Sequence, residues 1–150
     1  MAGRNTFRSA FWNAMGILHV RITLWQLYGA SVDCTKEYVS MMGSLSSEHY
    51  PSPYVSNTDC LYSILPAGNP GLYKLAFHDI RLPSDGDFVE VTEGSTGKQL
   101  GLFTTPGPVP ILVGDSFIVR FKTNAAGNDI GFSLSWSRKF NNSFSAMINF

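Results

Sequence analysis

Three histidines and two cysteines are the residues of this chain that could do chemistry. His78 stands beside Asp79, but neighbours on a strand point to opposite faces, so the two do not form a charge-relay pair. His49 follows Glu48 in a polar segment, and His19 lies in the N-terminal stretch. No nucleophile-bearing motif and no metal-ligand spacing accompanies them. The sequence therefore predicts a protein that is not an enzyme and has no catalytic residues and no cofactor.

Residues 93–98 read Glu-Gly-Ser-Thr-Gly-Lys and superficially resemble a phosphate-binding loop. The glycine spacing of such loops is incomplete here, no Ser or Thr follows the lysine, and no helical pattern comes after it. A turn between two strands is the better interpretation.

Cys34 and Cys60 are compatible with one disulfide bond or with two free thiols. The residues alone leave this open, because the answer depends on whether the protein enters an oxidising compartment.

Bulk composition narrows the class of protein. A length of 150 residues fits one domain with a real core, and 44% hydrophobic against 15% charged residues argues against disorder. Eleven basic and eleven acidic residues cancel, and no basic stripe is present, so no nucleic-acid partner is expected.

Alternating apolar residues, cut by Gly and Pro turns, predict short half-buried strands. Each group on one face is inferred to be buried: Cys60, Tyr62 and Ile64; Tyr73, Leu75 and Phe77; Asp87, Val89 and Val91; Phe117, Val119 and Phe121; Ile130, Phe132, Leu134 and Trp136. Further strands are expected at residues 37–42, 100–103 and 111–113, with a polar connection over residues 45–59. Short strands at regular spacing predict an all-β sandwich or barrel.

Residues 1–31 resemble a secretory signal. Arg4 and Arg8 precede two apolar stretches, and no acidic residue occurs before Asp33. Cleavage of a signal peptide after Ser31 would place Gly29 and Ser31 at the positions before the cut that require small side chains. Alternatively, Met15 is the true start, or the segment is an amphipathic part of the mature protein. The apolar runs are too short to span a bilayer.

The order of features between Cys34 and Trp136 resembles a CUB domain. The matching pieces are Cys34, Tyr-Pro-Ser-Pro-Tyr at residues 50–54, Cys-Leu-Tyr-Ser-Ile at 60–64, Phe-His-Asp-Ile-Arg-Leu at 77–82, Asp-Phe-Val-Glu-Val at 87–91, and Gly-Phe at 131–132. The resemblance implies a two-sheet antiparallel β-sandwich of jelly-roll type over residues 32–137. Residues 138–150 would then form a tail with a glycosylation sequon at Asn141.

The resemblance also implies site residues. Cys34 and Cys60 would form the first disulfide of the family, while the cysteines of the second are missing. The calcium-ligand positions correspond to Arg81, Asp87 and Asn124, of which only Asp87 is a carboxylate. We therefore expect no bound metal and an ion pair between Arg81 and Asp87, with an unpaired surface Arg81 as the alternative.

By the same resemblance, the chain is expected to be a secreted, non-catalytic recognition module that binds an extracellular protein or glycan, standing alone or as a fragment of a larger protein such as a protease. An intracellular β-sandwich with free thiols is a third possibility. Candidate binding loops lie at residues 45–57, 93–98 and 104–110.

Overall fold

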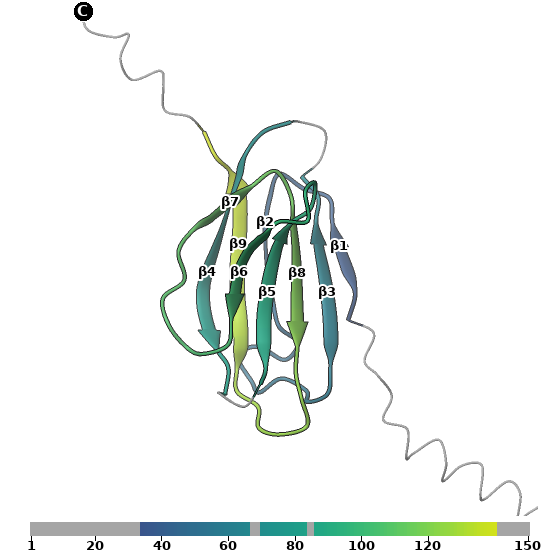
Figure 1. The fold of residues 1–150 in the computed structure, drawn as a ribbon, viewed down its shortest axis with the longest axis vertical. Coiled ribbons are helices and arrows are strands. Elements are labelled where there is room, and N and C mark those ends of the chain that lie inside the picture. The colour runs from purple at the N-terminus through teal and green to yellow at the C-terminus, as the bar shows by residue number, and fades with distance from the viewer. Residues whose placement is uncertain (1–33, 67–69, 84–85, 141–150) are drawn as a thin grey trace, which may run out of the picture. The chain divides into compact units, whose positions relative to one another are not determined.

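Two facing β-sheets make up the computed structural model, which describes residues 34–66, 70–83 and 86–140 (Figure 1). One sheet contains, in spatial order, β1 (Lys36–Tyr38), β3 (Asp59–Ile64), β8 (Phe117–Lys122), β5 (Phe88–Glu93) and β6 (Gln99–Phe103). The other contains β2 (Met42–Ser46), β9 (Gly131–Arg138), β4 (Tyr73–Arg81) and β7 (Leu112–Gly114). The predicted all-β sandwich is confirmed.

Neighbouring strands run antiparallel with one exception, since β1 lies parallel to β3. A strand parallel to its neighbour cannot join it through a tight hairpin, and the chain between them first contributes β2 to the opposite sheet. In the part of the chain that the structure describes, no helix is long and apolar enough to cross a membrane.

The prediction of one strand over residues 37–42 was wrong. The chain leaves β1 after Tyr38, turns, and enters the other sheet at Met42. The side chain of Ser40 supports the turn by donating a hydrogen bond to the carbonyl of Met42. Within β2, a β-carbon at Gly43 would overlap the Trp136 ring, so close packing requires the glycine.

Alternating residues of both sheets fill the space between them, as predicted. Within this core, aromatic rings meet edge to face: Phe132 contacts Tyr62, Phe77 and Phe121 at centroid distances of 6.0, 6.0 and 5.4 Å. Such contacts add to the burial of apolar area, which is the main term that stabilises the sandwich.

A β-bulge interrupts β4 between Phe77 and Asp79, where the pairing with β9 shifts register. The additional residue is His78, whose exposed imidazole Nε2 lies 2.7 Å from the hydroxyl of Ser135. The bulge reverses the alternation of the strand, so Ile80, rather than Asp79, faces the core. Every residue of β4 beyond the bulge therefore points to the side opposite to that expected from the start of the strand.

A disulfide joins Cys34 to Cys60, with 4.9 Å between their Cα atoms. Cys34 precedes β1 and Cys60 lies in β3, so the bond fixes the short parallel strand β1 at its beginning. The predicted pairing is confirmed, and the thiols of both cysteines are accounted for.

Removing the disulfide should destabilise the domain. Because the bond closes a loop between residues 26 positions apart, the double change Cys34→Ala and Cys60→Ala should lower the free energy of unfolding by about 3 to 4 kcal/mol. Guanidinium unfolding of the oxidised parent and the variant measures the difference. Equal midpoints for the two proteins would contradict the assignment.

Candidate functional site

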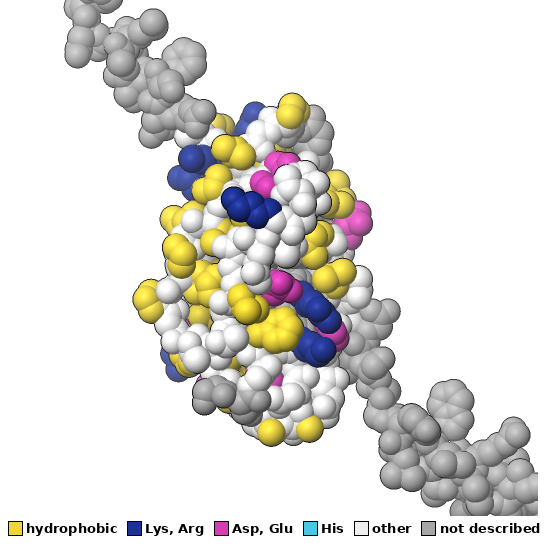
Figure 2. All heavy atoms as spheres, in the orientation of Figure 1, with side chains coloured by type: hydrophobic (Ala, Val, Ile, Leu, Met, Phe, Trp, Pro, Cys, Tyr) yellow, Lys and Arg dark blue, Asp and Glu magenta, His cyan; other side chains and the backbone are white. Residues whose placement is uncertain are grey.

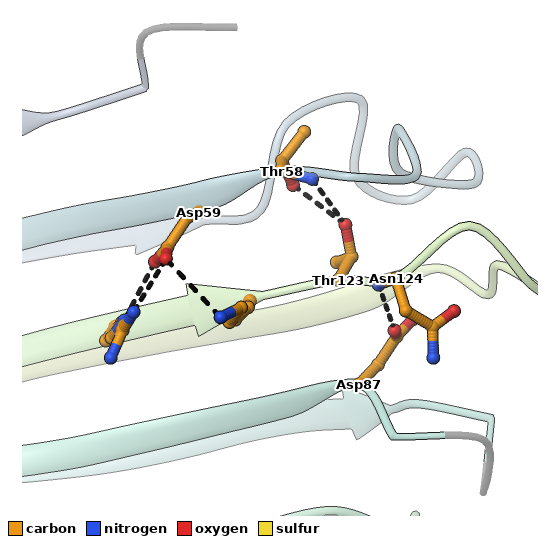
Figure 3. Close-up of polar contacts among 7 residues, drawn as sticks. Thr58, Asp59, Asp87, Thr123 and Asn124 are labelled. Atoms are coloured by element: carbon orange, nitrogen blue, oxygen red, sulfur yellow. Dashed lines mark hydrogen bonds and ion pairs between the residues drawn. The ribbon is translucent and has the colours of Figure 1, made fainter. Parts of the chain in front are cut away.

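Asp87 and Asn124 lie together at one end of the sandwich, as the resemblance implied. Asp87 immediately precedes β5 and Asn124 follows β8, and these two strands are antiparallel neighbours. The backbone N–H of Asn124 donates a hydrogen bond of 2.7 Å to Oδ1 of Asp87 (Figure 3). The hydrogen bond connects the end of β8 to the beginning of its neighbour in the sheet, β5.

The second carboxylate oxygen of Asp87 has a partner that the sequence did not reveal. The hydroxyl of Tyr54 donates a hydrogen bond of 2.6 Å to Oδ2. Both residues are buried, and Asp87 has no solvent exposure. The backbone N–H of Tyr54 donates to the carbonyl of Asp129, so three segments meet at this carboxylate. The motif Tyr-Pro-Ser-Pro-Tyr was recognised in the sequence, but nothing in it indicated that its second tyrosine would point inward.

The expected ion pair between Arg81 and Asp87 is not formed, and this prediction was wrong. The guanidinium of Arg81 instead lies 3.4 Å from Oδ1 of Asp79, through Nε, and its side chain is 59% exposed. The bulge at His78 is the physical cause, because it places Asp79 and Arg81 together on the outer face of β4.

A second polar contact closes the same end. The Thr58 N–H donates a hydrogen bond of 2.9 Å to Oγ1 of Thr123, and the two hydroxyl oxygens lie 3.0 Å apart (Figure 3). The Thr123 N–H in turn donates to the Thr58 carbonyl at 2.9 Å. The Thr123 hydroxyl also donates to the carbonyl of Val55 at 3.1 Å. These bonds hold the loop before β3 against the end of β8.

The residues at this end do not fit a calcium ion, which requires six to eight oxygen ligands with several carboxylates. Asp87 is the single carboxylate of the three positions, and its oxygens accept from Tyr54 and Asn124. Oδ1 of Asn124 accepts the backbone N–H of Ala126 at 2.7 Å, and Arg81 brings a positive charge on the outer face. Among the described residues, no group of three or more His, Cys, Asp or Glu side chains could hold a metal.

Charged side chains form a band across the outer face of the sheet that contains β8 (Figure 2). Arg120 makes two hydrogen bonds to Asp59, from Nε at 2.8 Å and from Nη2 at 2.6 Å, and Nζ of Lys122 lies 4.0 Å from the same carboxylate. The hydrogen bonds from Arg120, together with the positive charges of Arg120 and Lys122, lower the pKa of Asp59. The guanidinium also lies 6.0 Å from the centre of the Phe88 ring.

Other expectations from the sequence have mixed outcomes. Residues 93–98 form the turn between β5 and β6, where Gly97 has a φ of 70° and donates its N–H to the carbonyl of Glu93. This confirms the strand turn rather than a phosphate loop. The sequon at Asn141 and the segment 1–31 lie outside the described residues, so both remain predictions.

The buried carboxylate of Asp87 should matter for stability. Replacing Asp87 with Ala removes the acceptor of two hydrogen bonds, from the buried Tyr54 hydroxyl and the partly buried Asn124 N–H, and we expect a loss of about 3 kcal/mol in the free energy of unfolding. Asp87→Asn is the matched control and should be milder, because its amide can accept from Asn124 while the Tyr54 hydroxyl turns to accept. Denaturant unfolding measures both variants. A loss below about 1 kcal/mol for the alanine variant would contradict this role.

The pair of Asp59 and Arg120 predicts a dependence on pH. Since the folded-state pKa of Asp59 is lowered, its stabilising effect is present above the unfolded pKa and is lost as the pH falls through the folded value. Asp59→Asn should therefore lower the midpoint of unfolding slightly at neutral pH, less at high salt, and not at all in strong acid. The same change in an Arg120→Met background should have a smaller effect on the midpoint, because only the contact of Asp59 with Lys122 is then lost. A difference from the parent that persists in acid would count against the ion pair.

Comparison with known proteins gives one family. The sequence profile of the CUB domain matches residues 34–136. Cubilin from Rattus norvegicus is 31% identical over 126 residues, which cover 77% of this chain and 3% of cubilin. The chain thus spans about 3% of the length of the cubilin relatives that it matches.

Solved structures show the same fold. The CUB1-EGF-CUB2 region of human MASP-1/3 matches with a TM-score of 0.64 at 22% identity, over 73% of this chain and 44% of that one. The CUB2 domain of MASP-1 bound to Ca²⁺ matches with a TM-score of 0.61 at 20% identity, over 72% and 99%. With the disulfide, the two sheets and the match over residues 34–136 in place, the chain belongs to the CUB domain family.

Proposed function

We propose that this chain is a secreted recognition module that binds an extracellular protein or glycan without the help of calcium. Membership of the CUB family supplies the class, which is a non-catalytic extracellular binding module. The disulfide between Cys34 and Cys60 fits an oxidising environment. Binding in such modules depends on loops and edges that a rigid sandwich presents.

The observation that supports independence from calcium is the set of contacts at Asp87. Its two oxygens accept from Tyr54 and Asn124, so protein donors connect three segments at the end where the resemblance places an ion. A loop arrangement held by its own hydrogen bonds is ordered before a ligand arrives. Removing divalent ions then has no structural consequence.

A second candidate is that the chain is a part of a larger extracellular protein. Its matched region is a small fraction of cubilin, and the solved MASP-1/3 fragment combines two CUB domains with an EGF domain. In that case the domain would position or recruit the rest of the protein. Full-length transcripts distinguish the two candidates, because a continuous reading frame beyond this sequence favours the second.

The proposed route of secretion rests on residues 1–31. N-terminal sequencing of protein recovered from the culture medium should begin near Val32, and loss of mass after glycosidase treatment should report a glycan on Asn141. Protein that retains Met1 and stays in the cytosol would count against secretion.

Calcium independence is testable directly. The full chain is screened against arrayed glycans and extracellular proteins, and each hit is measured with EDTA and with added CaCl₂. We expect affinities that agree within about twofold and an unfolding temperature that does not respond to calcium. The MASP-1 CUB2 domain, solved with Ca²⁺, is the positive control for ion-dependent stabilisation. A calcium-binding isotherm for the present chain, or a ligand released by EDTA, would refute this part of the proposal.

A further inference from the structure

The edge of β4 is only partly paired. On one side it pairs with β9 along its whole length, but β7 covers the other side only at Tyr73, Lys74 and Leu75. Along residues 76–81, no strand in the described part of the chain lies on that side. Alternate peptide groups of a strand point to each neighbour, so this half of β4 directs backbone N–H and C=O groups away from β9.

The connection from β6 to β7, residues 104–111, runs beside the same half of β4 (Figure 1). Its prolines at 106, 108 and 110 have no N–H to donate. No hydrogen bond is found between residues 104–111 and residues 76–81. A proline-containing loop is a common cover for a sheet edge, but this one is not bonded to the strand.

A groove of about 260 Å³ lies between the two segments, lined by residues 77–81 and 106–109. We call this the edge groove. Phe77, Val109 and the two prolines at 106 and 108 contribute apolar surface, and His78, Asp79 and Arg81 contribute polar atoms. The walls therefore offer apolar contacts beside an open strand edge.

Arg81 is the charged group in the edge groove with donors to spare. Its Nε contacts Asp79, while the N–H groups on its two terminal nitrogens have no partner among the described residues. The oxygens of Asp79 face Arg81 and the hydroxyl of Tyr50, at 3.4 and 3.5 Å. A planar guanidinium with free terminal nitrogens matches the geometry of a carboxylate, which it can bind with two parallel hydrogen bonds.

The open backbone edge of β4 favours an extended chain, because only a strand can pair with its N–H and C=O groups residue by residue. At about 3.3 Å per residue, the open half of β4 has the length for roughly six residues of an added strand. A polyanionic glycan needs several cations, and the described lining of the edge groove has one, Arg81, which is already shared with Asp79 through Nε. A peptide with a single acidic side chain and alternating apolar residues satisfies the backbone edge, the apolar wall and the guanidinium together.

We propose that the edge groove binds an extended, acid-containing peptide segment of a partner protein, which adds to β4 as a strand and places its carboxylate on Arg81. The inference rests on the proposed recognition function and assigns the site and the class of partner to it. Backbone pairing supplies affinity, and Arg81 and the apolar wall supply selectivity.

The test uses the full 150-residue chain. Random eight-residue peptides displayed on phage are selected on it, and enriched sequences are resynthesised with fluorescein for anisotropy titration. We expect Asp or Glu at one fixed position with apolar residues at alternate positions. Arg81→Glu should weaken binding by about tenfold or more, the size expected for losing a charge-assisted pair. Arg138→Glu is the matched control, because it makes the same charge change on the same sheet opposite Tyr73, at the other end of β4.

Two further measurements test the pairing itself. N-methylation of the peptide at alternate residues should abolish binding for one set of positions and leave the other set unaffected, because only one set donates to β4. Gly107→Trp should block the edge groove and leave the unfolding temperature unchanged, since a β-carbon at Gly107 meets no atom within 4 Å.

Failure of the edge groove and failure of the recognition function give different results. Ligands from the screen of proteins and glycans that bind the parent, Arg81→Glu and Gly107→Trp equally well would overturn the edge groove and leave the recognition function standing. Heparin that binds and is lost in Arg81→Glu, with no peptide enriched, would replace the peptide by a glycan and overturn this inference. Failure of the chain to bind any protein, glycan or peptide would reject the recognition function as well.

Discussion

A carboxylate that is removed from water must be given hydrogen-bond donors, and this requirement organises one end of the sandwich. Asp87 has no solvent exposure, so its two oxygens require donors from elsewhere in the chain. Tyr54 supplies one and the backbone of Asn124 the other. The loops before β3 and after β8 are thereby fixed in place around β5. An ion could serve the same purpose in a related domain, but here the donors belong to the protein.

A second constraint is the bulge at His78, which decides which residues of β4 face the core and which face outward. Before the bulge, β4 contributes Leu75 and Phe77 to the core; after it, Ile80 takes the inner place and Arg81 the outer. The guanidinium is therefore excluded from the buried carboxylate and becomes part of the surface at the open edge of β4. One inserted residue thus removes Arg81 from the structural cluster and makes it available for recognition.

Most of the fold could be predicted because the strands alternate so regularly. The buried faces of β3, β5, β8 and β9 agree with the pattern of apolar residues, and the pairing of Cys34 with Cys60 followed from the family resemblance. The division of residues 37–42 between β1 and β2 could not be predicted, because it depends on which sheet each part joins, and the partner strands β3 and β9 are distant in sequence. The partner of Arg81 was missed for a similar reason, since a bulge depends on the register with another strand.

The disulfide between Cys34 and Cys60 determines how the domain would bear mechanical tension. Tension applied through the segment that precedes Cys34 enters the domain next to the disulfide and passes directly into β3, which lies inside its sheet between β1 and β8. The three-residue β1 is bypassed and is not peeled away by such a pull. Tension on the other side leaves through β9, which lies between β2 and β4 in the opposite sheet. A tethered copy of this domain would therefore carry force through two inner strands, and reduction of the disulfide would transfer the pull to the three-residue β1.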